Sequence, residues 1–156
     1  MSWEIYRKGY KSFLKLEKSL SDNTVESYMR DLDKLISFAQ QHEIKPKTLT
    51  YDDLQKFLSD IAKSGMGARS RARLISGVKS FYGYLLVEEV IEENPTELLQ
   101  TPKLPAKLPD TLSIEEINAI IGSIDMSAPD GLRNKTILET LYGCGLRVTE
   151  LVELKL

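Results

Sequence analysis

Residues 68–87 read ARSRARLISGVKSFYGYLLV, and the spacing of apolar residues in this stretch decides the class of fold. Apolar side chains recur every three or four positions, as they do on one face of an α-helix. The residues of this stripe are Leu74, Ile75, Val78, Phe81, Tyr82, Leu85 and Leu86. The same stretch contains three arginines and one lysine but no carboxylate. It therefore predicts a long amphipathic helix with one buried face and one basic face.

The polar face of this helix is the first candidate site. With a turn of about 100° per residue, one line of side chains falls opposite the apolar stripe, and two more lie near it. The line is Arg69, Arg73, Ser76 and Ser80, and the neighbours are Ser70 and Lys79. Arginine can grip phosphate or guanine with two donors, and serine lets the backbone come close. We predict that this face contacts DNA, with an ordinary solvated face as the alternative.

Three more amphipathic patterns come before this stretch. The first covers about residues 3–16. The second starts at the capping residues 21–24 and runs to about 41. The third begins at Thr50, with Asp53 three residues further on as in a capping box, and ends at residues 64–65. Together with residues 68–87, these patterns predict a bundle of four helices.

The second predicted helix also has a polar face. Opposite its apolar stripe lie Asn23, Ser27, Arg30 and Lys34, with Thr24 in the same set. Its acids Glu26, Asp31 and Asp33 are expected nearer the margins of this face. We predict that the five residues of the set contact DNA as well.

After the fourth helix the composition changes. Asn94-Pro95 ends the helical pattern, and residues 96–99 are a candidate short helical turn. Three prolines in the next ten residues predict an extended, semi-rigid connector. We therefore predict a helical domain at 1–100, a linker at 101–110 and the start of a second domain at 111–156. Further helices follow, one capped by Ser113 and Glu116 and one running into Gly143. With no strand pattern, the predicted class is all-α.

Bulk composition limits the kind of protein. The net charge is −2, so a DNA-binding surface must come from local arrangement of charge. No apolar run is long enough to cross a bilayer, and the N-terminus lacks the pattern of a signal peptide. One cysteine, Cys144, and one histidine, His42, cannot build a disulfide or a metal site. We expect a cytoplasmic protein without metal, cofactor or membrane partner.

Arg147 follows a glycine-rich turn, and its role has two interpretations. It could be a surface arginine that pairs with Glu150 three residues on, which stabilises a helix by only a few tenths of a kcal/mol. Alternatively, an arginine at a rigid helix start can stabilise charge that builds on phosphate oxygens during phosphoryl transfer. Gly143 and Gly145 would allow the turn that aims Arg147, and Glu150 would orient it.

Several segments resemble the tyrosine recombinases, especially the Xer and integrase branch. Residues 141–151, LYGCGLRVTEL, resemble the motif around the first catalytic arginine of that family. Residues 21–32, SDNTVESYMRDL, are similar to the family's opening motif, and residues 69–85 to its next helix. Residues 93–95 and 107–109 stand where the family has an NP turn and a K-x-LP linker. The resemblance covers nearly the whole chain in the right order.

The resemblance implies a four-helix, SAM-like core-binding domain that clamps double-stranded DNA, followed by the start of a catalytic domain. It implies a parent enzyme that breaks and rejoins DNA through a 3′-phosphotyrosine link, as a tetramer or heterotetramer on paired sites. Arg147 would be catalytic, with Glu150 supporting it. None of the seven tyrosines matches the nucleophile motif, so we expect residues 1–156 to bind DNA without cleaving it. The alternatives are a helical protein-interaction domain and a regulatory DNA-binding domain.

Overall fold

The computed structural model describes residues 2–104 and 110–155. It divides into two compact units, Met1–Pro105 and Ala106–Leu156, which are described separately below. All secondary structure of the described residues is helical, which confirms the predicted all-α class. Residues 105–109, which include the K-x-LP part of the predicted linker, lie outside the described residues. None of the described helices combines the length and hydrophobicity that a membrane span requires.

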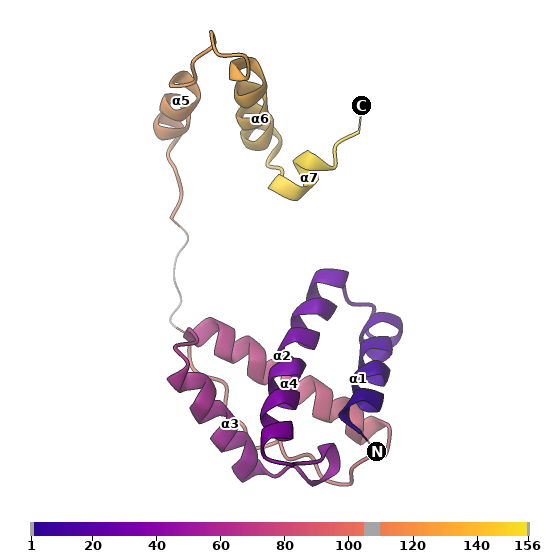
Figure 1. The fold of residues 1–156 in the computed structure, drawn as a ribbon. Coiled ribbons are helices and arrows are strands. Elements are labelled where there is room, and N and C mark those ends of the chain that lie inside the picture. Colours follow the sequence, from indigo (N-terminus) through magenta and orange to yellow (C-terminus); the bar gives the residue numbers. More distant parts are fainter. Residues whose placement is uncertain (1, 105–109, 156) are drawn as a thin grey trace. The chain divides into compact units, whose positions relative to one another are not determined.

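The first unit contains four α-helices joined by short turns (Figure 1). These are α1 (Trp3–Ser12), α2 (Asp22–Gln41), α3 (Tyr51–Lys63) and α4 (Ala68–Val87). The predicted first helix is regular only to Ser12, because Phe13–Glu17 continues as a π-helical turn. A short 3₁₀ turn, Pro46–Thr48, leads into α3. The predicted ranges of α2, α3 and α4 agree with the structure to within about one residue.

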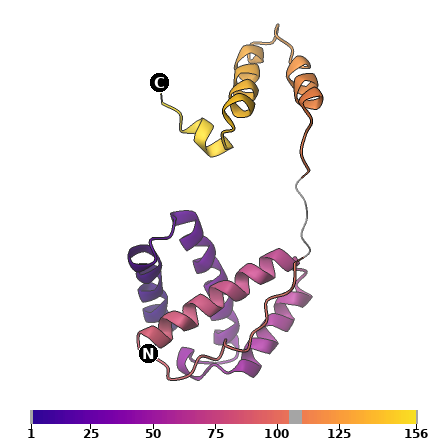
Figure 2. The ribbon, with the colours of Figure 1, turned by 180° about the vertical axis from the view of Figure 1, so that it is seen from behind.

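The core of the first unit forms where α4 packs against α1 and α2, as seen from behind in Figure 2. Phe81 of α4 is fully buried at its centre. The Phe81 ring stacks on Trp3 at 6.0 Å between centroids and meets Tyr10 edge-on at 5.3 Å. The predicted stripe of α4 is buried except for Leu86, which is 41% exposed near the helix end. Aromatic packing against α1 therefore sets how α4 is rotated about its axis.

The predicted helix starts are confirmed by their hydrogen bonds. Ser21 caps α2 by accepting from the Thr24 amide, and Thr50 and Asp53 form a complete capping box on α3. The short turn predicted at 96–99 is present over residues 95–98, but it does not continue as a helix. There, the Asn94 side chain accepts hydrogen bonds from the Thr96 amide and hydroxyl, at 2.9 and 2.7 Å. These bonds stabilise the turn that follows Asn94.

The described part of the second unit, residues 110–155, contains three helices and very little buried surface. They are α5 (Ile114–Gly122), α6 (Gly131–Cys144) and α7 (Val148–Val152). Ser113 and Glu116 form the predicted capping box of α5. Among residues 110–155, the structure buries only Gly131. The hydrophobic core of the described chain therefore belongs to the first unit.

Candidate nucleic-acid interface

The N-terminal half of α4 presents most of its predicted line to solvent. Arg69, Ser70, Arg73 and Ser76 are exposed, whereas Lys79 and Ser80 are half-buried. The Ser76 hydroxyl donates to the carbonyl of Ala72, one turn back in the same helix, at 3.1 Å. The exposed part of the face is therefore the first two to three turns of α4, residues 69–76.

The start of α4 is unusually positive. Its N-cap is Gly67, which supplies no side-chain acceptor, and its first turns contain Arg69, Arg71 and Arg73 but no acid. The free amides at a helix start already carry partial positive charge, so cations there are unfavourable unless an anion is present. Arg71 is half-buried, and its Nε finds no hydrogen-bond partner within the described residues. This end of α4 is suited to bind phosphate.

Asp31 occupies a different place from the one its sequence position indicates. We predicted it at the margin of the polar face of α2, but its side chain is fully buried between α2 and α4. Gly77 of α4 lies beside this side chain, and a Cβ there would make an ordinary contact of 3.5 Å with the Asp31 Cβ. The polar faces of α2 and α4 thus meet at this crossing instead of lying free side by side.

The buried Asp31 carboxylate forms ion pairs with two of the predicted DNA-contacting cations, and its Oδ2 accepts no hydrogen bond within the described residues. Its Oδ2 lies 2.8 Å from Arg73 Nη1, and its Oδ1 lies 3.2 Å from Lys34 Nζ. Arg73 Nη1 also donates to the carbonyl of Ser27 at 3.2 Å. Arg73, Lys34 and Ser27 are therefore brought together, and the two cations are not the free side chains that the sequence pattern indicates. The group retains one net positive charge.

The rest of the predicted α2 set lies apart from this crossing. Asn23 is exposed in the first turn, and the Thr24 hydroxyl shares a 2.9 Å hydrogen bond with Ser21. Arg30 is exposed beside a hollow between α1 and α2. Of the predicted α2 residues, Ser27 and Lys34 therefore lie at the α2–α4 crossing, whereas Arg30 lies beside α1.

Cations of α1 and the following turn line the same hollow as Arg30, and we did not single them out from the sequence. They are Arg7, Lys11 and Lys15, whose regular spacing of four was the available signal. Arg7 binds Asp33 through two hydrogen bonds of 2.6 and 3.0 Å, which raises the pKa of its guanidinium. Lys15 pairs with Asp22 at 2.7 Å and lowers the pKa of that carboxyl. Asp33 and Asp22 thus neutralise two of these cations, Arg7 and Lys15.

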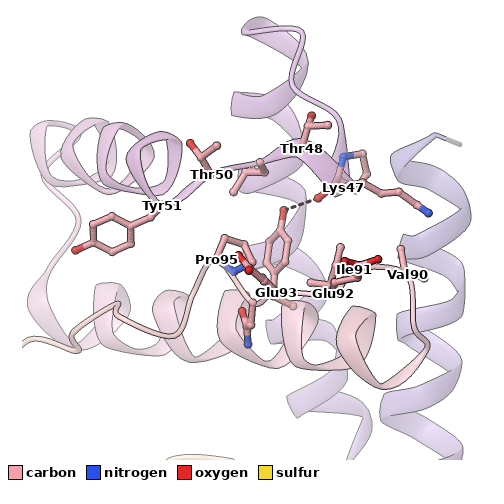
Figure 3. Close-up of a pocket in the computed structure, with 13 residues that line it drawn as sticks. Lys47, Thr48, Thr50, Tyr51, Val90, Ile91, Glu92, Glu93 and Pro95 are labelled. Atoms are coloured by element: carbon pink, nitrogen blue, oxygen red, sulfur yellow. Dashed lines mark hydrogen bonds between the residues drawn. The ribbon is translucent and has the colours of Figure 1, made fainter.

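The hollow drawn in Figure 3 lies between the segment before α3 and the segment after α4. The Tyr82 hydroxyl donates to the carbonyl of Pro46 at 3.1 Å, and both residues line the hollow. Glu92 and Glu93 line the hollow against a single lysine, Lys47, among its lining residues. Its charge is therefore unsuited to a nucleic-acid backbone.

Arg147 stands at the start of α7, after a turn made by one glycine. Gly145 ends α6 in the left-handed conformation, with φ of 63°. Gly143, which we predicted to share this task, lies inside α6 in regular helix. The turn thus needs Gly145 alone.

The Arg147 side chain is 82% exposed and pairs with Glu150 as both interpretations require. Its Nη1 lies 2.9 Å from Glu150 Oε1, and its backbone amide donates to Oε2 at 2.7 Å. Glu150 therefore holds one edge of the guanidinium. The remaining donors make no hydrogen bond within the described residues, so a phosphate could bind them.

Comparison with known proteins now adds to this geometry. Residues 8–89 match the family described as phage integrase, N-terminal SAM-like domain. The chain belongs to the phage integrase family of tyrosine recombinases. The matched residues include α2 and α4, and thus the α2–α4 crossing.

Curated relatives of this recombinase family include two proteins named Tyrosine recombinase XerD. The one from Staphylococcus haemolyticus is 38% identical over 148 residues, which cover 94% of this chain and 50% of the relative. The one from Yersinia pestis is 41% identical over 139 residues, covering 89% of this chain and 46% of the relative. The chain therefore spans about half the length of the curated relatives it matches.

A solved structure shares the fold. The integrase from mycobacterium phage Brujita aligns with a TM-score of 0.57 over 92% of this chain and 46% of that chain, at 19% sequence identity. At this identity the likeness concerns the fold alone.

Proposed function

We propose that residues 1–100 form the DNA-clamping domain of a site-specific recombinase and that residues 111–156 begin its catalytic domain, joined by a linker at 101–110. The recombinase would act in the cytoplasm as a tetramer or heterotetramer on paired DNA sites. It would break and rejoin DNA through a 3′-phosphotyrosine link. The support is membership of the recombinase family and the likeness to proteins named XerD over nearly the whole chain.

The observation that carries the DNA-binding proposal is the basic, acid-free α4. Arg69 and the exposed edge of Arg73 project from its start, where amides without side-chain capping favour an anion. Ser70 and Ser76 are short side chains that let a phosphate or groove edge come close. Arg30, which lies beside the hollow between α1 and α2, would contact the DNA at a second, separate place.

The proposal for Arg147 is transition-state stabilisation in the complete recombinase. The guanidinium edge that Glu150 leaves open would donate to the non-bridging oxygens of the scissile phosphate. Residues 1–156 would give no covalent adduct, because none of their tyrosines resembles the family's nucleophile. A denaturant-resistant adduct with a nicked suicide substrate would refute this part.

Salt-dependent binding to a short DNA duplex tests the DNA-binding proposal. Fluorescence anisotropy at several salt concentrations should show affinity that falls as salt rises, because each phosphate that the protein neutralises releases counterions. The double variant Arg30→Gln with Arg69→Gln should bind more weakly. Its salt slope should be reduced by about 0.9 for each phosphate that is no longer neutralised.

The matched control is Lys56→Gln with Lys63→Gln, which removes the same charge from α3. These lysines sit beside Asp53 and Asp60, at 3.7 and 3.5 Å. The control should bind DNA nearly as well as the unmodified chain. Equal loss of affinity in both doubles would mean generic charge attraction, and absence of duplex binding would favour the alternative of a protein-interaction domain.

A further inference from the structure

We infer that Asp31 is a positioning residue of the DNA-binding face, which holds Arg73 and Lys34 together as one unit for a phosphate. This inference rests on the proposed DNA-binding function. A buried acid would ordinarily be expected to repel DNA. In this proposal Asp31 instead favours DNA binding.

Each cation contacts Asp31 on its buried side, and its other side faces solvent. Asp31 is fully buried, whereas the side chains of Arg73 and Lys34 are 42% and 40% exposed. Arg73 Nη1 donates a hydrogen bond to the Ser27 carbonyl and lies at ion-pair distance from Asp31 Oδ2, which accepts no hydrogen bond within the described residues. Within the described part of the chain, its Nε and Nη2 therefore form an open two-donor edge of the kind that binds phosphate.

The arrangement also joins two helices at one point. Lys34 comes from α2 and Arg73 from α4, and both reach the same carboxylate beside Gly77. A long cation that is free in solution loses side-chain freedom when it binds a ligand. Asp31 already orders the side chains of Arg73 and Lys34, so these side chains lose less conformational freedom when DNA binds. A supporting partner that fixes a binding group in place is how rigid sites are built.

Charge makes the two cations interdependent. Together with Asp31 they carry one net positive charge. If Arg73 is removed, the charge of Lys34 is cancelled by the carboxylate it still contacts. Independent surface cations would instead lose affinity additively.

The variant Asp31→Asn separates positioning from simple repulsion by the sign of its effect. It keeps the shape of the side chain but removes one negative charge, so general electrostatics predicts tighter DNA binding. The positioning role predicts affinity about three- to tenfold weaker, the range that follows from freeing a long side chain.

Glu26→Gln is the matched control, because it removes the same charge from an exposed position on α2. It should bind duplex DNA as tightly as the unmodified 156-residue chain or more tightly. Thermal unfolding of each variant shows that the protein is folded at the temperature of the binding measurement. If Asp31→Asn is folded and binds with equal or higher affinity, the inference is overturned while the proposed function stands.

A second measurement leaves Asp31 in place and so does not depend on the stability of that variant. Arg73→Gln, Lys34→Gln and the double variant are compared by anisotropy with the same duplex. The double should lose little more affinity than Arg73→Gln alone. Losses that add would overturn the inference, and an unmodified chain that shows no salt-dependent duplex binding would overturn the proposed function as well.

Discussion

At the residue scale, two buried tyrosines link the stability of the first unit to pH. Tyr10 and Tyr82 are fully buried, and burial raises the pKa of both phenols because an ionised phenolate would lose its hydration. The folded pKa values lie above the usual value of 10.0. Their stabilising contribution is therefore complete below about pH 10 and is lost as pH rises further, because the unfolded chain ionises first.

Tyr82→Phe tests this pH dependence. The variant loses the hydrogen bond to Pro46, so its unfolding free energy at pH 7 should fall by about 1 kcal/mol. Above about pH 10 it should lose stability less steeply than the unmodified chain, since one fewer phenol ionises on unfolding. Chemical denaturation between pH 7 and 11 measures both effects. If the unfolding free energies of the two chains fell in parallel above about pH 10, ionisation of Tyr82 would not contribute to the pH dependence.

Arg147→Lys tests the catalytic proposal in a longer recombinase that contains these residues. One ammonium group cannot reproduce the two-donor edge, so the rate of DNA cleavage should fall by about 10²-fold or more. Binding to the same DNA should change little. The matched control is Arg133→Lys, an exposed arginine of α6 that pairs with Asp130 at 3.4 Å. An unchanged cleavage rate for Arg147→Lys would refute the role.

At the element scale, α4 shows that the same substitution can have opposite effects on two helices. Gly83 lies inside α4 with open space where a Cβ would be. Gly83→Ala should therefore raise the unfolding free energy by about 0.5–1 kcal/mol, because alanine restricts the unfolded chain. Gly9 of α1 lies directly against the Tyr84 hydroxyl, where a Cβ would clash.

Gly9→Ala should displace the buried Tyr84 ring and lower the unfolding free energy by about 1–3 kcal/mol. Denaturant titration of the two variants gives the comparison directly. If both stabilise the chain, α1 and α4 do not approach as closely as the structure describes.

At the scale of the whole molecule, the hydrophobic core lies in the first unit, whereas the second unit exposes apolar side chains. We therefore predict that the chain self-associates. The second unit exposes Leu132, Val148, Val152 and Leu154, and a hollow between α5 and α6 is almost wholly apolar. Its lining includes Ile120 and Tyr142, which are 44% and 50% exposed, and the half-buried Leu138 and Leu141. Exposed apolar patches of this kind promote association.

Sedimentation should therefore show concentration-dependent dimers or aggregates of the 156-residue chain. A chain that ends at residue 104 retains the core and should remain a monomer. Ile120→Ser with Tyr142→Ser should reduce association, whereas Leu16→Ser in the first unit should not. The same monomeric species for the full and the shortened chain would count against this prediction.

Local features were predictable from the sequence because they depend on neighbours along the chain. The capping boxes at Thr50 and Ser113 need only a partner three residues away. The Arg147–Glu150 pair has the same spacing and forms as predicted. The predicted turn after Asn94 is also present, although it does not extend into a helix.

The all-helical class, the ranges of α2 to α4, the buried stripe of α4 apart from Leu86 and its basic, acid-free character follow from the sequence, since periodicity and composition are properties of single segments. Which polar side chains remain free depends instead on tertiary packing. Asp31 and Arg73 are 42 residues apart in sequence, and they meet because α2 and α4 pack against each other. A helical wheel places each residue around its own axis, but burial of a charge depends on the neighbouring helix.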